Sequence, residues 1–157
     1  MKFDVLNYIH ESNLIEGIDN PAEDVQSLKA WEFLGGTHIL TLDVLKKLHR
    51  LITKNQLPLH HRGKTRSELR VNVFIGDRIG AEWYLCGHIL SNWIIDYEKK
   101  ANDPLKAHIN YEFIHPWIDG NGRTGRMILW WHELNNNQMP TLFLNSEKYE
   151  KYYPLFK

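Results

Sequence analysis

The chain has 157 residues, of which 43% are hydrophobic and 24% are charged. These proportions are typical of an ordinary globular protein and exclude a disordered or fibrous chain. The 19 basic and 19 acidic residues cancel, which argues against a nucleic-acid partner, because such partners usually require a basic excess. The single cysteine, Cys86, excludes an internal disulfide and a cysteine-based zinc site.

No linker, repeat or low-complexity tract divides the sequence, so we expect one domain over residues 1–157. The first residues lack the apolar run of a secretory signal. No stretch approaches the roughly 20 apolar residues of a membrane span. We therefore expect a cytoplasmic protein that does not contact a membrane, although an effector exported by another route would have the same features.

Helical periodicity dominates the first third of the chain. Residues 3–17 predict a helix that stops at Gly17, a residue type favoured just after a helix end. Its apolar stripe consists of Phe3, Leu6, Tyr8 and Ile9. Asn20 and Pro21 are typical of the start of a second helix, and Thr41 of the cap of a third. The third helix has one apolar face, formed by Leu42, Leu45, Leu48 and Ile52.

Glycines interrupt the helical pattern between residues 60 and 85. From Leu69 to Ile75, apolar and polar residues alternate, which predicts a short strand. The sequence "GDRIG" that follows predicts a turn back, so we expect a β-hairpin here. Helical patterns resume over 88–100, 103–114, 125–134 and 146–153. The fold class is therefore expected to be all-α with one small β-hairpin.

Residues 115–126, "HPWIDGNGRTGR", concentrate groups suited to phosphate chemistry. Gly120 and Gly122 flank Asn121 just before a predicted helix, where free backbone N–H groups and the helix dipole favour an anion. Arg123 and Arg126 lie three residues apart and share one side of that helix. Because guanidinium groups bind phosphate oxygens in pairs, two of them suggest a polyphosphate.

Asp119 and His115 complete this set. A single carboxylate beside phosphates is typical of a Mg²⁺ site. A histidine can take a proton from a hydroxyl near neutral pH. Each feature alone has a plainer explanation, such as a turn or a solvated helix face. Their occurrence together within twelve residues favours attack by a hydroxyl on a nucleotide phosphate.

This segment resembles the signature of Fic domains, histidine-proline-phenylalanine-x-acid-Gly-Asn-Gly-Arg-x-x-Arg. It departs from the signature at Trp117, where phenylalanine is usual and where we expect a packing residue. Three other segments are similar to parts of that family. They are "LTLDVLKKLHRLI" before the hairpin, "RGKTRSELRVNVFIG" at its start, and "SEKYEKYY" near the end.

The resemblance implies a Fic-type helical bundle with a β-hairpin flap at about residues 66–84. It also implies transfer of AMP from ATP to a hydroxyl of a target protein, with release of pyrophosphate. In this chain the implied roles are base for His115, Mg²⁺ ligand for Asp119, and nucleotide or phosphate binding for Gly120, Asn121, Gly122, Arg123 and Arg126. The implied target-docking edge comprises Leu69, Arg70, Val71, Asn72 and Val73.

The stretch "SNLIEG" resembles the inhibitory pattern of the same family. Ser12, Glu16 and Gly17 fill its defined positions. The resemblance implies that Glu16 pairs with Arg126 and so displaces the γ-phosphate, as in class II members, whose inhibitory helix precedes the core. Without the resemblance, Glu16 would be a surface residue at the unfavourable negative end of a helix.

Several alternatives stay open from the sequence. Relatives of the Doc type transfer the γ-phosphate, but their loop departs from the Gly-Asn-Gly-Arg-x-x-Arg pattern seen here. Another donor than ATP, or removal of AMP from a target, would use the same loop. A non-catalytic nucleotide-binding module is a rival of a different class, although simple binding gives no reason for a base such as His115. The target protein is not named by the sequence, and its apolar helix faces suit either a core or a homo-oligomer.

Overall fold

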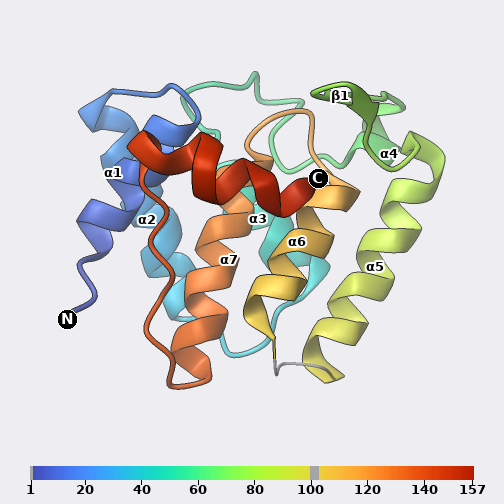
Figure 1. The fold of residues 1–157 in the computed structure, drawn as a ribbon. Helices are drawn as coiled ribbons and strands as arrows, with labels where there is room; N and C mark the ends of the chain where they lie inside the picture. Colours follow the sequence, from blue (N-terminus) through green and yellow to red (C-terminus); the bar gives the residue numbers. More distant parts are fainter. Residues whose placement is uncertain (1, 100–102) are drawn as a thin grey trace.

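The computed structural model describes residues 2–99 and 103–157, and it shows a helical bundle with one small hairpin (Figure 1). The predicted fold class is therefore confirmed. The helices are α1 (Val5–Ile15), α2 (Pro21–Gly35), α3 (Leu42–Ile52), α4 (Arg66–Leu69), α5 (Trp83–Lys99), α6 (Pro104–Ile114) and α7 (Asn121–Asn135). The strands are β1 (Phe74–Ile75) and β2 (Arg78–Ile79). Three short turns of 3-10 and π type follow at Asn145–Glu147, Lys148–Tyr152 and Tyr153–Phe156.

The helix boundaries follow the predicted capping residues. The Asn20 side chain accepts a hydrogen bond from the backbone N–H of Ala22, and Pro21 occupies the first helical position of α2. Thr41 and Asp103 cap α3 and α6 in the same way. Gly17 has φ of 75°, the left-handed conformation predicted for the residue after α1. The helix predicted over 88–100 is α5, and its last residue, Lys100, lies outside the described residues.

The buried face of α1 differs from the predicted stripe. Tyr8 and Ile9 are buried, but Leu6 is 56% exposed, so its predicted burial is wrong. The same buried face continues at helical spacing through Ser12 and Asn13, which are polar. These polar residues could not be recognised as part of a buried face from hydrophobicity, because their partners are charged groups elsewhere in the chain.

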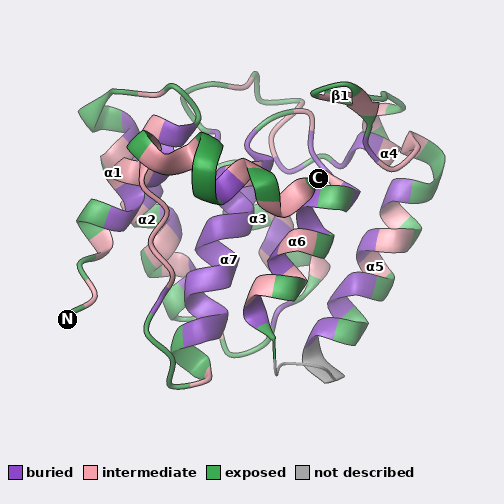
Figure 2. Ribbon diagram, viewed as in Figure 1, coloured by how far each residue is buried: buried purple, intermediate pink, exposed green. Residues whose placement is uncertain are grey.

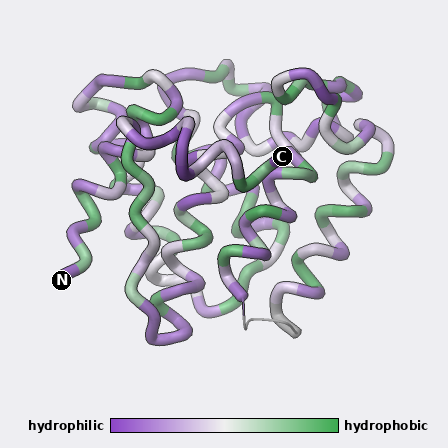
Figure 3. The backbone as a smooth tube through the Cα atoms, viewed as in Figure 1, coloured by the Kyte–Doolittle hydropathy of each residue, from purple (hydrophilic) through white to green (hydrophobic). Residues whose placement is uncertain are grey.

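Helix α7 forms the centre of the core. Every residue from Met127 to Trp131 is buried, so this part of the helix is enclosed on all sides. Figure 2 shows α7 as a buried column between α2 and α6, with the C-terminal segment lying across its upper end. Its lower end runs into the polar residues 135–138, which Figure 3 shows as a hydrophilic turn. The buried column positions the N-terminus of α7 close to the loop at residues 115–120.

The predicted strand from Leu69 to Ile75 is wrong over most of its length. Residues up to Leu69 form α4, Arg70 has a left-handed φ of 57°, and the strand contains only Phe74 and Ile75. A capping box explains the helical turn: the Thr65 hydroxyl accepts from the Glu68 backbone, and the Glu68 carboxylate accepts from the Thr65 backbone.

The hairpin itself is present, but it is shorter and lies later in the chain than predicted. Phe74 pairs with Ile79 and Ile75 with Arg78, and Gly76 makes the turn with φ of 62°. Before it, the Asn72 side chain accepts from the backbone N–H of Trp83, so a side-chain bond takes the place of a strand pairing.

Among the described residues, none of the helices combines the length and apolar character that crossing a membrane requires.

Candidate active site

A tight loop at residues 115–120 joins α6 to α7, and left-handed residues stand at both of its ends. His115 has φ of 52° and Gly120 has φ of 77°. A Cβ on Gly120 would lie 2.7 Å from the side chain of Thr53, so the position needs glycine for space as well as for conformation. The Asn121 amide closes the loop: its Nδ2 donates to the Trp117 carbonyl at 2.8 Å and its Oδ1 accepts from the Trp117 N–H at 2.9 Å.

Trp117 and His49 support the loop from below. Trp117 is fully buried, donates its Nε1–H to the Tyr111 hydroxyl, and stacks on the His49 ring at 4.3 Å between centroids. The tautomer of His49 follows from its partners. Its Nδ1 accepts from the Gly63 N–H, so Nε2 carries the proton and donates to the Asp119 carbonyl at 2.9 Å. Burial lowers the pKa of His49 to about 4, so the ring is neutral at physiological pH.

Two buried arginines extend from the first turns of α7. Arg123 is 2% exposed and Arg126 is 1% exposed. Arg123 donates one N–H to the side-chain amide oxygen of Gln56. Among the described residues, its Nε and Nη1 have no hydrogen-bond partner, and neither has Nη1 of Arg126. The N-terminus of α7 has no side-chain cap either. Buried donors without acceptors are costly, so this end of the helix is prepared for an anion.

The structure brings Glu16 of α1 to this N-terminus. Its Oε1 accepts from Arg126 Nη2 at 2.7 Å. The same oxygen lies against Gly122, where a Cβ would collide with it. Ser12 binds the same guanidinium twice: its hydroxyl accepts from Nε at 2.8 Å and its carbonyl from Nη2 at 2.9 Å. The pairing of Glu16 with Arg126 expected from the sequence is therefore present, and the carboxylate stands at the helix end that attracts anions.

The C-terminal segment holds the end of α1 in this position. The carbonyl of Ile15 accepts from Lys148 Nζ at 3.2 Å and from the Tyr153 hydroxyl at 3.4 Å. The Tyr152 ring lies 5.0 Å from the Arg126 guanidinium carbon, a cation–π contact. Burial lowers the pKa of Arg126, but Tyr152 and Glu16 outweigh this effect and raise it above its usual range.

A cavity of about 790 Å³ opens between α1, the hairpin, α6, the start of α7 and the C-terminal segment. Glu16, Gly122 and His115 are among its lining residues. Its volume is in the range of pockets that hold nucleotide-sized molecules. The wall beside His115 comes from the turn at residues 75–78, whereas the predicted docking residues 69–73 do not line it.

His115 is a neutral imidazole in this environment. Burial lowers its pKa to about 4, and the charge of Arg66 lowers it further in the same direction. Its Nδ1 lies 3.8 Å from the Glu112 carboxylate. Burial raises the pKa of Glu112 to about 8, against the opposing effect of Arg126, so this carboxyl group is mostly protonated at pH 7. A neutral histidine in the cavity wall can accept a proton.

Asp119 fits a Mg²⁺ site of the kind that relies on substrate phosphates. Its side chain is exposed, and its Oδ1 accepts from the Gly120 N–H at 2.6 Å. No group of three or more acidic, histidine or cysteine residues that could enclose a metal occurs in the described part of the chain. Mg²⁺ typically takes one or two carboxylate oxygens and completes its shell with water and phosphate, which Asp119 beside an anion site can satisfy.

The structure thus brings together the predicted residues around the start of α7: His115, Asp119, the loop glycines, Arg123, Arg126, Ser12 and Glu16. Sequence reasoning missed His49, Gln56 and Arg66. Each of them has a hydrogen-bond partner far away in the chain, at Asp119, Arg123 and His115 respectively. The role of Asn121 in orienting a phosphate stays a prediction; in this structure its amide bonds to the backbone of Trp117.

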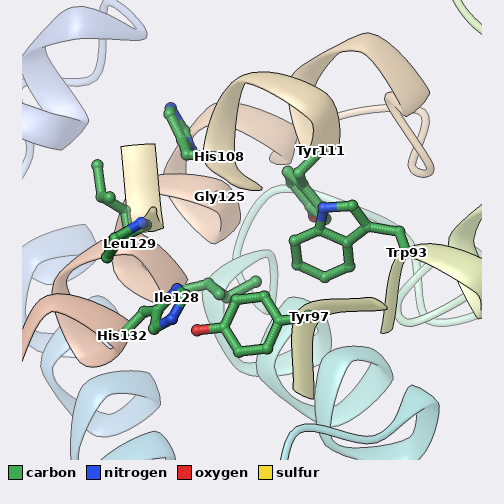
Figure 4. A pocket seen from close by; sticks show the side chains of 9 residues that line it. Trp93, Tyr97, His108, Tyr111, Gly125, Ile128, Leu129 and His132 are labelled. Atoms are coloured by element: carbon green, nitrogen blue, oxygen red, sulfur yellow. The ribbon is translucent and has the colours of Figure 1, made fainter. Parts of the chain in front are cut away.

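A second pocket, lined from α5, α6 and α7, is part of the core (Figure 4). Tyr97 and His132 are in contact there, with ring centroids 4.2 Å apart. It leaves no room for a water molecule, and burial lowers the pKa of His108 on its wall to about 3. We assign it no ligand.

Comparison with known proteins matches residues 39–132 to the model of the Fic/DOC family. Among curated relatives, protein adenylyltransferase VopS from Vibrio parahaemolyticus is 32% identical over 130 residues, which are 82% of this chain and 32% of the relative. Protein adenylyltransferase fic-1 from Caenorhabditis briggsae is 30% identical over 99 residues, 59% of this chain and 19% of the relative. The chain spans about a third or less of the length of these relatives.

Solved structures are similar over nearly the whole chain. Fic-1 (residues 134–508) from C. elegans has a TM-score of 0.76 at 20% identity, covering 99% of this chain and 55% of that one. A Fic domain containing signaling protein from Bacteroides thetaiotaomicron has a TM-score of 0.75 at 18% identity, covering 96% of this chain and 70% of that one. At these identities the likeness establishes the fold.

Proposed function

The chain belongs to the Fic/DOC family, and from that premise we propose that it is an autoinhibited protein adenylyltransferase. It transfers AMP from ATP to a Ser, Thr or Tyr hydroxyl of a target protein, which can be the chain itself, and releases pyrophosphate. The names of its relatives support adenylyl transfer. The observation that carries the proposal is the N-terminus of α7. There Gly122 lines a cavity that has a neutral histidine in its wall, and two buried arginines of the same helix keep donors without a partner among the described residues.

The reaction forms one bond and breaks one bond. The target hydroxyl oxygen attacks the α-phosphorus of ATP, and the bond from that phosphorus to the bridging oxygen of the β-phosphate breaks. His115 accepts the hydroxyl proton, and its neutral state leaves a ring nitrogen free to do so. Arg123 and the N–H groups that begin α7 hold the phosphate oxygens, and Arg126 holds the γ-phosphate. Asp119 would hold Mg²⁺, and that ion would supply positive charge beside the phosphates and the leaving pyrophosphate.

Glu16 inhibits this reaction by taking the place of the γ-phosphate. Its carboxylate occupies the Arg126 guanidinium and covers Gly122, so the polyphosphate cannot settle along the start of α7. ATP held in a displaced pose presents its α-phosphorus out of line with His115. A shift of about 1 Å is enough to reduce a rate roughly 10²-fold.

The hairpin is the proposed docking edge for the target. Ile75 and Arg78 line the cavity beside His115, and Phe74 is 77% exposed. A target segment that adds to this two-stranded edge through main-chain hydrogen bonds would bring its hydroxyl to His115. We place the proposed docking edge on the hairpin at residues 74–79, whereas the sequence suggested residues 69–73.

Labelled ATP tests the reaction directly. The Glu16→Gly chain is incubated with host lysate and Mg²⁺, using ATP that carries ³²P at the α position in one sample and at the γ position in a parallel sample. Compared with a parallel His115→Ala control, adenylyl transfer adds protein label in the α sample alone. Label added above the control in the γ sample alone would instead show phosphate transfer. Nucleotide binding without protein label in either sample would favour a non-catalytic binding module.

A further inference from the structure

Arg66 is a fully buried cation for which nucleotide binding gives no explanation. It is 0% exposed, and it is not part of any ion pair formed within the described residues. Burying a guanidinium is costly unless its donors are satisfied. Burial lowers the pKa of Arg66, and the nearby charge of Glu82 compensates only in part. Hydrogen bonds at this position must therefore offset the cost of burying the Arg66 charge.

Those hydrogen bonds all go to backbone carbonyls of two segments. Nε donates to the His115 carbonyl at 2.6 Å, and Nη2 donates to the Ile114 carbonyl at 3.0 Å. Nη2 also donates to the Ala81 carbonyl, just after the hairpin, and Nη1 to the Val71 carbonyl, before it. One side chain thus connects the end of α6 with both ends of the flap.

The contacts at the α6 end explain how His115 keeps its unusual backbone. A left-handed residue other than glycine is strained and persists where surrounding groups hold it. The last carbonyls of a helix lack partners within the helix, and Arg66 satisfies two of them at this end. Its own backbone N–H donates to the Pro116 carbonyl at 2.8 Å, which adds a third bond to the same turn.

The flap packs directly on Arg66 and His115. A Cβ on Gly80 would lie 3.0 Å from Arg66 Nη2 and 3.3 Å from the Cβ of His115. The absence of a side chain at Gly80 therefore lets the returning strand approach both groups closely.

We infer that Arg66 is a positioning residue that fixes the base His115 and both ends of the docking flap in one rigid unit. It aligns the imidazole with the hydroxyl of a segment docked on the flap. This role deepens the proposed function and rests on it. Arg66 has no hydrogen bond to the residues that would bind the nucleotide, so its effect is on the transfer step.

The charge of Arg66 has a measurable effect on the His115 pKa, and a general loss of stability would not produce that effect. Among the described residues, the charged or titratable groups that act on His115 include Arg66 from α4, Arg78 from β2, Glu112 from α6 and Glu16 from α1. Burial lowers the His115 pKa most, and the charge of Arg66 has the second-largest lowering effect. Removing its charge should raise that pKa toward the ordinary value of a histidine, whereas a lysine should keep it low.

The test compares Arg66→Gln and Arg66→Lys with Arg62→Gln. Arg62 is the matched control because its Nε also donates to a backbone carbonyl at 2.6 Å, that of Leu57, which belongs to neither α6 nor the flap. In the Glu16→Gly background, we expect kcat for AMP transfer to fall about 10²-fold in both Arg66 variants, with the KM for ATP within about twofold of its parent. The control should keep both values.

NMR titration of the His115 ring, assigned by comparison with His115→Ala, completes the test without any activity. We expect its pKa to rise in Arg66→Gln and to stay low in Arg66→Lys and Arg62→Gln. Normal kcat in a folded Arg66 variant, or an equal loss in Arg62→Gln, would overturn the inference. If Arg66→Gln does not fold, two measurements on Arg66→Lys decide the inference. They are its kcat and the amide hydrogen exchange at residues 71–81 and 113–117. A folded Glu16→Gly chain without AMP transfer would instead refute the proposed function. In that case the His115 titration and the amide exchange data still test the positioning role of Arg66.

Discussion

Replacing Glu16 by glycine should activate the enzyme, and the structure sets the scale of the gain. The carboxylate makes one charge-assisted hydrogen bond of 2.7 Å to a guanidinium that is 1% exposed. Such bonds contribute about 1.5–3 kcal/mol, which corresponds to roughly 10- to 100-fold in rate if ATP must displace the carboxylate completely. The Glu16 side chain is 35% exposed, so solvent screens the pair, and we expect a gain near the lower end of this range, roughly tenfold.

The assay is AMP transfer to the chain itself and to lysate proteins, followed by α-³²P incorporation. Asp19→Gly is a suitable control because it removes an exposed acid three residues away without touching Arg126. Glu16→Gln should be intermediate, since it keeps a hydrogen-bond acceptor but removes the charge. The gain should vanish when Glu16→Gly is combined with Arg126→Ala, because the γ-phosphate site is then lost.

A folded Glu16→Gly chain that is no more active than wild type on every substrate would refute autoinhibition by α1. Equal activation by Asp19→Gly would refute the specific role of the Arg126 pair and would attribute the effect to bulk charge. The Ser12 contacts to Arg126 remain in both variants, so the guanidinium stays ordered and the comparison isolates the carboxylate.

Three further outcomes are expected in the Glu16→Gly background. His115→Ala should reduce AMP transfer by about 10²–10⁴ while calorimetric ATP affinity stays nearly normal; strong loss of binding would contradict its role as base. The rate of transfer should stay constant as pH falls from 8 to about 5, because the His115 pKa is lowered to about 4 and the ring stays neutral above that pH. A fall in rate with a midpoint near pH 6.5 would contradict this. Ile75→Pro, in the shortened flap, should impair modification of target protein but leave ATP binding intact, and unchanged target labelling would exclude docking by strand addition.

The parts of the fold that sequence reasoning predicted correctly depend on neighbours close in the chain. Caps such as Asn20 and Thr41 bond to N–H groups two or three residues away, so the local sequence contains the whole interaction. The glycines of the signature loop belong to the same class, because Gly120 needs its left-handed conformation for a turn whose residues are adjacent.

The flap could not be predicted from its alternating pattern. The alternation from Leu69 to Ile75 is real, but two other influences prevail over it. The Thr65–Glu68 capping box starts a helical turn, and Arg66 holds the Val71 carbonyl from within the core. The second influence depends on Arg66 being buried among carbonyls 5 to 49 residues away, which no local pattern encodes.

The position of the proposed inhibitory contact suggests how it can be reversed without unfolding. Arg126 is buried and held by Ser12, so it stays in place when Glu16 leaves. The body of α1 is anchored separately: Asn13 donates to Asp24 at 2.7 Å, and the Tyr8 hydroxyl donates to the Pro140 carbonyl. Release therefore requires movement of the partly exposed Glu16 side chain alone. Because both the carboxylate and the γ-phosphate need the same guanidinium, the affinity of Glu16 for Arg126 sets the ATP affinity of the productive state.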